Sequence, residues 1–200
     1  MQHLFKQGKK DKPTLLLLHG TGGNEYDLLP LADIVDRDAS VLSVRGEVLE
    51  NGMPRFFRRL AEGVFDEEDV VSRTKQLYEF LDGAAKEYDF DRSNVIAIGY
   101  SNGANIAASL LYHYKDSLKG AILHHPMVPR RGIGLPDLSG TFTFIAAGKN
   151  DPICPTSEPE ELYAALEQAG SDVTIYWEYN GHSLSRSETV ESAKWYETHV

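Results

Sequence analysis

The sequence contains a single cysteine, Cys154, among its 200 residues. No intrachain disulfide can form, so nothing in the cysteine content exploits an oxidising compartment, which favours the cytoplasm. Long hydrophobic runs are also absent. No stretch approaches the ~20 apolar residues of a membrane span, and the lysine-rich N-terminal segment lacks the apolar core of a signal peptide. We therefore expect a cytoplasmic protein without stable membrane association.

Basic residues are scarce, with 20 Lys and Arg against 30 Asp and Glu, a formal net charge of -10. Such a charge repels nucleic acid, so we expect no nucleic-acid partner. The hydrophobic fraction of 42% and the charged fraction of 25% are ordinary for a globular protein. The length is typical of one folding unit, and we expect a single domain over residues 1–200.

Apolar runs and helical periodicities alternate along the chain. The runs predict strands at residues 14–18, 40–44, 94–98, 120–123, 141–147 and 173–179, and several are apolar at nearly every position, as in parallel strands covered on both faces. Helical spacing occurs at residues 26–35, 67–88, 102–114, 159–169 and 188–199. The alternation predicts an α/β fold with a mostly parallel sheet, helices on both faces and a ligand site at the carboxyl ends of the strands.

The pentapeptide Gly-Tyr-Ser-Asn-Gly at residues 99–103 fits the pattern G-x-S-x-G, in which a serine occupies a sharp turn between strand and helix. The pattern alone is weak evidence, because an ordinary Gly/Ser turn has the same composition. Here a predicted strand ends at Gly99 and a predicted helix begins after Ser101. This context makes Ser101 a candidate nucleophile.

A serine hydroxyl needs a histidine as base and a carboxylate that orients the histidine. Asp151 follows the predicted strand at 141–147, and His182 follows the predicted strand at 173–179. Taken alone, Asp151 is equally typical of an Asp-Pro turn and His182 of a surface loop. Together with Ser101 they form the order serine, acid, histidine that is found in α/β-hydrolases, each at a strand exit.

Acyl transfer also needs donors for the developing oxyanion. One is the amide of Asn102, directly after the nucleophile, and by position the second is the amide of Thr21, in the His-Gly-Thr-Gly-Gly loop after the first predicted strand. A phosphate-binding loop is the competing interpretation. The glycine spacing matches neither G-x-G-x-x-G nor a Walker motif, so we expect no nucleotide cofactor.

Two other groups of residues have less specific signals. His124 and His125 are adjacent near a strand end, where alternation predicts opposite directions and thus no shared metal; we expect no metal site. Cys154 lies on no strand-to-helix turn and is interpreted as an incidental thiol.

The irregular stretch at residues 45–66 leaves a strand end and should border the site. Its aromatic and basic residues have two interpretations: packing of the phenylalanines in the core with solvated arginines, or a role in binding. In the second, Met53, Phe56 or Phe57 lines the substrate pocket and Arg58 or Arg59 attracts an anionic substrate.

Across nearly its whole length the sequence resembles the phospholipase/carboxylesterase family of α/β-hydrolases, which includes acyl-protein thioesterases. The motifs that carry this resemblance are residues 18–23, 99–103, 151–153 and 181–182. Residues 45–46 and 50–57 resemble, more narrowly, small bacterial carboxylesterases associated with quinone or hydroquinone stress. The resemblance implies Ser101 as nucleophile, Asp151 as acid and His182 as base. Tyr100 and Asn102 differ from the usual Phe and Gln of eukaryotic thioesterases, which speaks against protein depalmitoylation.

We therefore expect a minimal α/β-hydrolase fold without a cap domain, because the segment between His125 and Asp151 is too short to hold one. The expected activity is that of a serine carboxylesterase that hydrolyses a small-molecule ester through an acyl-enzyme, with no cofactor. A thioesterase, a lysophospholipase or a lactone-opening enzyme on the same triad, and a non-catalytic binding protein, are the alternatives. The sequence leaves a homodimer open.

Overall fold

Seven strands form one sheet in the order β1-β3-β2-β8-β9-β10-β11. The computed structural model describes residues 1–200. β1 pairs antiparallel with β3, and all other neighbours in this sheet are parallel. The strands are β1 (His3–Lys6), β2 (Thr14–Leu18), β3 (Ser40–Val44), β8 (Val95–Tyr100), β9 (Gly120–His124), β10 (Phe142–Gly148) and β11 (Asp172–Glu178). The mostly parallel sheet confirms the prediction, whereas the short, lysine-bearing edge strand β1 was not predicted.

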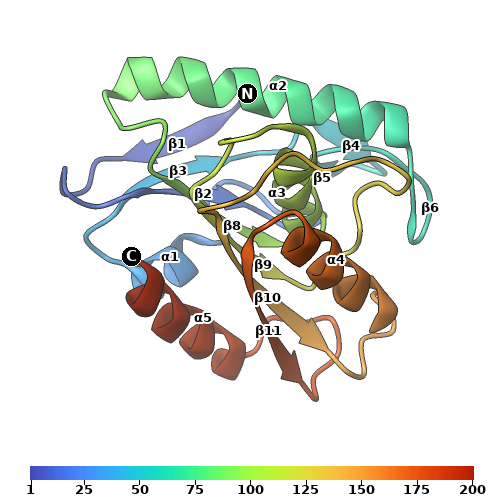
Figure 1. The fold of residues 1–200 in the computed structure, drawn as a ribbon. Coiled ribbons are helices and arrows are strands. Elements are labelled where there is room, and N and C mark those ends of the chain that lie inside the picture. Colours follow the sequence, from blue (N-terminus) through green and yellow to red (C-terminus); the bar gives the residue numbers. More distant parts are fainter.

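Helices cover both faces of this sheet, as Figure 1 shows. On one side lie α2 (Glu67–Tyr88), α3 (Asn102–His113) and α4 (Ser157–Gln168), and on the other lie α1 (Leu29–Val35) and α5 (Arg186–His199). Each side has its own hydrophobic core, of 27 buried residues on the α2 side and 16 on the α1 side. Burial on both faces explains why the central strands are apolar at successive positions.

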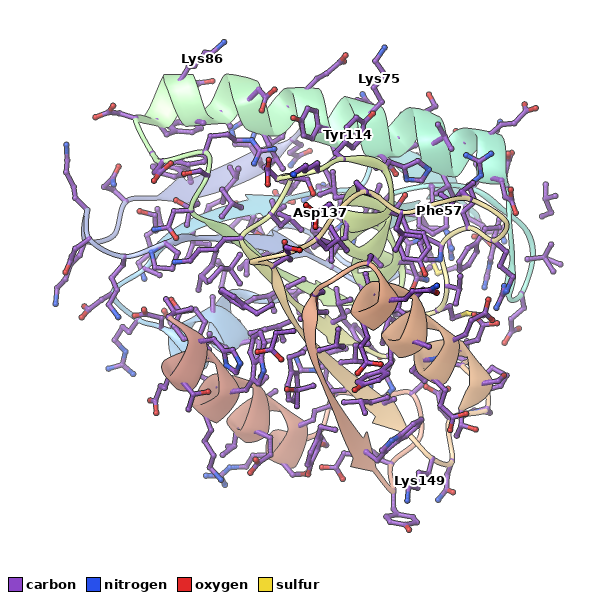
Figure 2. The ribbon with its side chains drawn as sticks, in the orientation of Figure 1. Phe57, Lys75, Lys86, Tyr114, Asp137 and Lys149 are labelled. Carbon is purple, nitrogen blue, oxygen red and sulfur yellow. The ribbon has the colours of Figure 1, made fainter.

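The longest helix, α2, coincides with the helix predicted at residues 67–88. The Asp66 side chain accepts a hydrogen bond from the amide of Asp69, which satisfies one of the free N–H groups at the helix start. The helix ends at Asp89, which adopts a left-handed conformation with φ of 55°. Figure 2 shows Lys75 and Lys86 on the outer face of this helix, pointing away from the sheet. None of the helices is long and apolar enough to cross a membrane.

The stretch predicted to be irregular, residues 45–66, forms two small hairpins after β3. The first pairs β4 (Val48–Glu50) with β5 (Met53–Arg55), and the second pairs β6 (Arg59–Ala61) with β7 (Val64–Phe65). The first hairpin turns at Asn51 and Gly52, both with positive φ, as a two-residue hairpin turn requires. The two hairpins thus hold this stretch beside the carboxyl ends of the strands.

Candidate active site

Ser101 lies in a tight turn between β8 and α3. Its φ of 51° and ψ of -113° are strained for a residue with a side chain. The helix approaches the strands so closely that a Cβ atom on Gly99 would overlap the backbone of Ala104, and one on Gly103 would overlap the carbonyl oxygen of Leu18. Glycine is therefore required on both sides of the turn, which presents the serine hydroxyl at the sheet edge.

The three residues predicted from strand exits lie in one hydrogen-bonded chain. His182 Nε2 is 2.8 Å from Ser101 Oγ, and His182 Nδ1 is 2.7 Å from Asp151 Oδ2. With its proton on Nδ1, the imidazole donates to Asp151 and accepts the serine proton at Nε2. This is the arrangement in which a histidine can remove a proton from a serine hydroxyl.

The Asp151 carboxylate is held by the backbone as well as by the histidine. Oδ1 accepts hydrogen bonds from the amides of Ile153 and Cys154, at 2.8 Å and 2.9 Å. Burial alone would raise the pKa of Asp151, but the hydrogen bonds from Cys154, His182 and Ile153 outweigh it and keep the pKa below its ordinary value. Asp151 is therefore ionised at neutral pH, as an orienting carboxylate must be.

Two backbone amides beside Ser101 are available to a ligand. The N–H groups of Thr21 and Asn102 donate to no other group of the protein, and both residues border the cleft above the serine. The Thr21 loop is fixed from outside, because the Gly22 amide donates to the Pro54 carbonyl at 2.9 Å and Arg55 Nη1 donates to Thr21 Oγ1 at 2.8 Å. Free amides on a rigid loop are suited to stabilise an oxyanion.

His19, for which the sequence indicated no role, also fixes this loop. Its Nδ1 donates to the Gly20 carbonyl at 2.6 Å, and its Nε2 accepts from the Gly46 amide at 3.0 Å. Burial lowers the pKa of His19, which agrees with a neutral ring that has one donor and one acceptor nitrogen. His19 thus connects the loop of Thr21 to the exit of β3.

The cleft over Ser101 has a volume of about 320 Å³ and is lined by 13 residues, of which four are hydrophobic. Around the triad and the two amides, the residues that shape it are Arg55, Arg59, Phe65, Asn105, Met127 and Ile153. Two arginines in the wall of a small cleft favour a polar or anionic ligand over a long acyl chain.

Of the five residues predicted to bind substrate, only Arg59 lines this cleft. Phe56 and Phe57 are 2% and 0% exposed and belong to the core on the α2 side, where Figure 2 labels Phe57. The Phe56 amide donates to Asn102 Oδ1 at 2.7 Å, so this segment passes beneath the serine turn. The prediction that either phenylalanine lines the pocket was therefore wrong.

Met53 and Arg58 also lie outside the cleft. Met53 belongs to the first hairpin and its side chain lies over Gly22. The exposed Arg58 side chain points to Asp66 and Asp69, because these acidic residues of the α2 start attract it outward. Arg55, which the sequence did not distinguish from its neighbours, is the second arginine of the cleft, where its buried guanidinium donates to Thr21 Oγ1 and to the Phe57 carbonyl.

His124 and His125 do not point in opposite directions as predicted. His125 has a φ of 52°, so it leaves the extended conformation in which alternation holds. As a result, His124 Nδ1 and His125 Nε2 contact the two oxygens of one buried carboxylate, Glu188, at 2.9 Å and 3.3 Å. Ligand atoms of His125, Asp151 and His182 lie within 4.8 Å of one another, a distance compatible with a metal, yet hydrogen bonds already occupy these atoms.

Cys154 is buried, and its thiol donates to the Pro126 carbonyl at 3.0 Å. Burial raises the pKa of this thiol to about 12. A thiol that stays protonated at neutral pH is a poor nucleophile, which agrees with its interpretation as an incidental cysteine.

Comparison with known proteins identifies relatives that match this chain over nearly its whole length. The chain is 60% identical to the putative hydrolase MhqD of Bacillus subtilis (strain 168) over 196 residues, which are 98% of each protein. The structure of the Bacillus cereus carboxylesterase is 66% identical with a TM-score of 0.99, and the match covers 100% of this chain and 95% of that one. A structure of YahD with malic acid is 32% identical with a TM-score of 0.95, covering 100% of this chain and 99% of that one.

These relatives confirm the α/β-hydrolase fold and the resemblance to small bacterial carboxylesterases. The chain is accordingly an enzyme that hydrolyses esters. The model of the Dienelactone hydrolase family matches residues 47–197, which include Ser101, Asp151 and His182. This protein therefore belongs to the dienelactone hydrolase family.

Proposed function

We propose that this protein is a serine carboxylesterase that cleaves small esters through an acyl-enzyme. His182 Nε2 takes the proton of Ser101 as its Oγ attacks the ester carbonyl carbon, and the amides of Thr21 and Asn102 hold the oxyanion. The tetrahedral intermediate collapses, and His182 gives the proton to the departing alkoxide. Water, deprotonated by His182, then attacks the acyl-enzyme and releases the carboxylic acid and free Ser101.

The unbroken chain of hydrogen bonds from Ser101 through His182 to Asp151 carries this proposal. Its two links of 2.8 Å and 2.7 Å have the length that proton transfer needs, without any rearrangement. A non-catalytic binding protein has no use for a strained serine, an oriented base and two free amides around one point. The proposed activity uses all of them.

The cleft supports a small substrate that carries a carboxylate. Arg55 and Arg59 share the single carboxylate of Glu50, with Nε to oxygen distances of 3.2 Å and 2.9 Å. Two guanidinium groups against one carboxylate leave donors for an anion. The only other acid at the cleft, Glu62, is exposed. The related protein YahD has been solved with malic acid, a small dicarboxylic acid.

The same wall argues against long acyl chains. A palmitoyl group needs a continuous apolar channel, and this cleft offers few hydrophobic residues, among them Phe65, Met127 and Ile153. Lysophospholipids and palmitoylated proteins are therefore poorer candidates than short esters and lactones. A short thioester would fit the cleft as well as a short ester.

The first experiment is hydrolysis of p-nitrophenyl esters from acetate to palmitate by the protein and by its Ser101→Ala variant. We expect turnover that falls steeply with chain length, and a variant that retains a thousandth of the activity or less, on the order of the loss seen when a triad member is removed. Ser109→Ala, which changes a buried serine within α3, is the matched control. Equal rates for the protein and Ser101→Ala would refute the proposed nucleophile.

A second experiment tests the anionic substrate. Neutral esters are compared with matched esters that carry a carboxylate, for the protein and for Arg59→Ala. We expect Arg59→Ala to lower kcat/KM for the carboxylate esters by roughly 10-fold and to leave the neutral ones nearly unchanged. Arg58→Ala is the control, because that side chain lies outside the cleft. If Arg59→Ala and Arg58→Ala show the same preference for carboxylate esters over neutral esters, the proposed attraction of an anionic substrate by Arg59 is wrong.

A further inference from the structure

The carboxylate of Asp151 is shared by two histidines. Oδ2 accepts a hydrogen bond from His182 Nδ1 at 2.7 Å and contacts His125 Nδ1 at 3.0 Å. The His125 side chain is fully buried, and that of Asp151 is 1% exposed. The proposed esterase mechanism uses His182 and leaves His125 without a role. A buried titratable group in direct contact with the proposed catalytic acid needs an explanation.

The second nitrogen of His125 faces another carboxylate. Nε2 is 3.3 Å from Glu188 Oε2, and Glu188, also fully buried, accepts from His124 Nδ1 at 2.9 Å. A neutral imidazole has one N–H and one lone pair, and a lone pair that faces a carboxylate oxygen is repelled. Both contacts are favourable only when both nitrogens of His125 carry protons. The imidazolium then lies between two carboxylates, which compensates its buried charge.

No other group around His125 supplies that positive charge. From β8 it is faced by Tyr100, whose ring lies 6.0 Å away, and from β9 by the adjacent His124. The loop after β10 contributes Asp151 and the protonated thiol of Cys154, the loop after β11 contributes His182, and α5 contributes Glu188. No lysine or arginine forms an ion pair with either carboxylate.

The directions of the pKa shifts agree with this assignment. Burial by itself lowers the pKa of His125, but the hydrogen bonds and charges of Glu188 and Asp151 outweigh it and raise the pKa. Burial would raise the pKa of Glu188, yet the hydrogen bonds from His124 and His125 lower it to about 2. Glu188 also lies in the first turn of α5, where the helix N-terminus stabilises an anion.

We propose that His125 is a positioning residue that remains protonated between Glu188 and Asp151, and that it holds the Asp151 carboxylate in the orientation in which Oδ2 accepts the hydrogen bond of His182 Nδ1. This proposal rests on the proposed triad. The imidazolium compensates part of the charge of the buried Asp151 carboxylate and fixes the oxygen that orients His182.

The first test needs no variant and no activity. In the histidine ¹⁵N spectrum of the folded protein, assigned through the backbone, His125 should show two protonated ring nitrogens at pH 7 to 8. A single protonated nitrogen at that pH would overturn the proposal. Because this measurement does not depend on turnover, it stays informative even if Ser101→Ala shows that the triad proposal is wrong.

The second test is the split between kcat and KM for His125→Gln, which removes the charge and keeps a side chain that forms hydrogen bonds. Glu188 retains His124 as a donor. We expect kcat for a short ester to fall roughly 10-fold with KM nearly unchanged, because a less firmly held Asp151 orients His182 less well. A purely structural role would lower the free energy of unfolding and leave kcat unchanged, and an unchanged kcat in the folded variant would overturn the proposal.

Discussion

The hydroxyl of Tyr100 donates a hydrogen bond of 2.6 Å to the backbone carbonyl of His182. Tyr100 is the residue before the proposed nucleophile, so this bond joins the turn that presents Ser101 to the loop that presents His182, the proposed base. Burial raises the pKa of Tyr100, which keeps the hydroxyl protonated and able to donate. Tyr100, one of the two residues at which this sequence differs from the eukaryotic thioesterases, thus has a defined structural role.

Replacing Tyr100 with phenylalanine should therefore loosen the His182 loop. The ring is retained, and the His182 carbonyl loses its donor. We expect the free energy of unfolding to fall by about 1 kcal/mol and kcat to fall by about 3- to 10-fold with little change in KM. Urea unfolding and steady-state kinetics measure both. Tyr176→Phe, which removes a hydroxyl bonded to Glu178, is the control; an unaltered kcat in Tyr100→Phe would show that the loop is held by other contacts.

Asp151→Asn should abolish most of the turnover while the protein remains folded. An amide at this position can direct its N–H₂ group at His182, which favours the wrong tautomer, and the serine protease precedent is a loss of ~10⁴ in kcat. The measurement is kcat for a short ester, with folding checked by circular dichroism. Asp137→Asn, a change at an exposed residue that Figure 2 labels, should have no effect. Turnover near normal in Asp151→Asn would exclude Asp151 from the triad.

Phe57 and Phe65 offer a direct comparison between core and cleft. Their rings are in contact, with centroids 5.0 Å apart, but Phe57 is fully buried and Phe65 lines the cleft. Phe57→Ala should lower the free energy of unfolding by about 3 to 5 kcal/mol with KM nearly unchanged. Phe65→Ala should raise KM at a smaller cost in stability. A raised KM with little loss of stability in Phe57→Ala would instead indicate that Phe57 contacts the substrate.

Glu188 makes the free energy of unfolding depend on pH in the acidic range. Its folded pKa of about 2 lies below the ordinary value of 4.5, so between these values the unfolded chain binds more protons. Its contribution is complete above pH 4.5 and is lost as the pH falls toward 2. We expect the free energy of unfolding, measured in urea, to fall across this window and Glu188→Gln to flatten the fall. Glu191→Gln, on the exposed side of the same helix, should leave the pH dependence of the unfolding free energy unchanged. The same pH dependence in the unaltered protein and in Glu188→Gln would contradict the lowered pKa of Glu188.

Local sequence patterns were sufficient for most of the fold. The helix at 67–88 was predictable to the residue, because Asp66 caps its start and its apolar spacing persists for six turns. The central strands were predictable because burial on both faces leaves a continuous apolar run, as at Thr14–Leu18. β1 was missed because a four-residue edge strand is half exposed and carries no such run.

The candidate triad could be named from the sequence because each member lies one to four residues after the end of a strand. In a parallel sheet the strand ends meet at one edge, so Ser101, Asp151 and His182 were expected together before any distance was known. The candidate oxyanion donors, the amides of Thr21 and Asn102, were predicted by the same reasoning, because the direction of a backbone N–H depends on the turn and not on a side chain.

What the tertiary structure alone decided is where side chains point once the backbone leaves regular conformation. The left-handed conformation of His125 turned its ring toward Asp151 and Glu188, which no alternation rule predicts. Arg55 was directed into the cleft and Arg58 outward by partners that are distant in sequence or belong to the next helix. Regular strands and helices impose a local period that a sequence records, whereas loop side chains take the direction that distant partners stabilise.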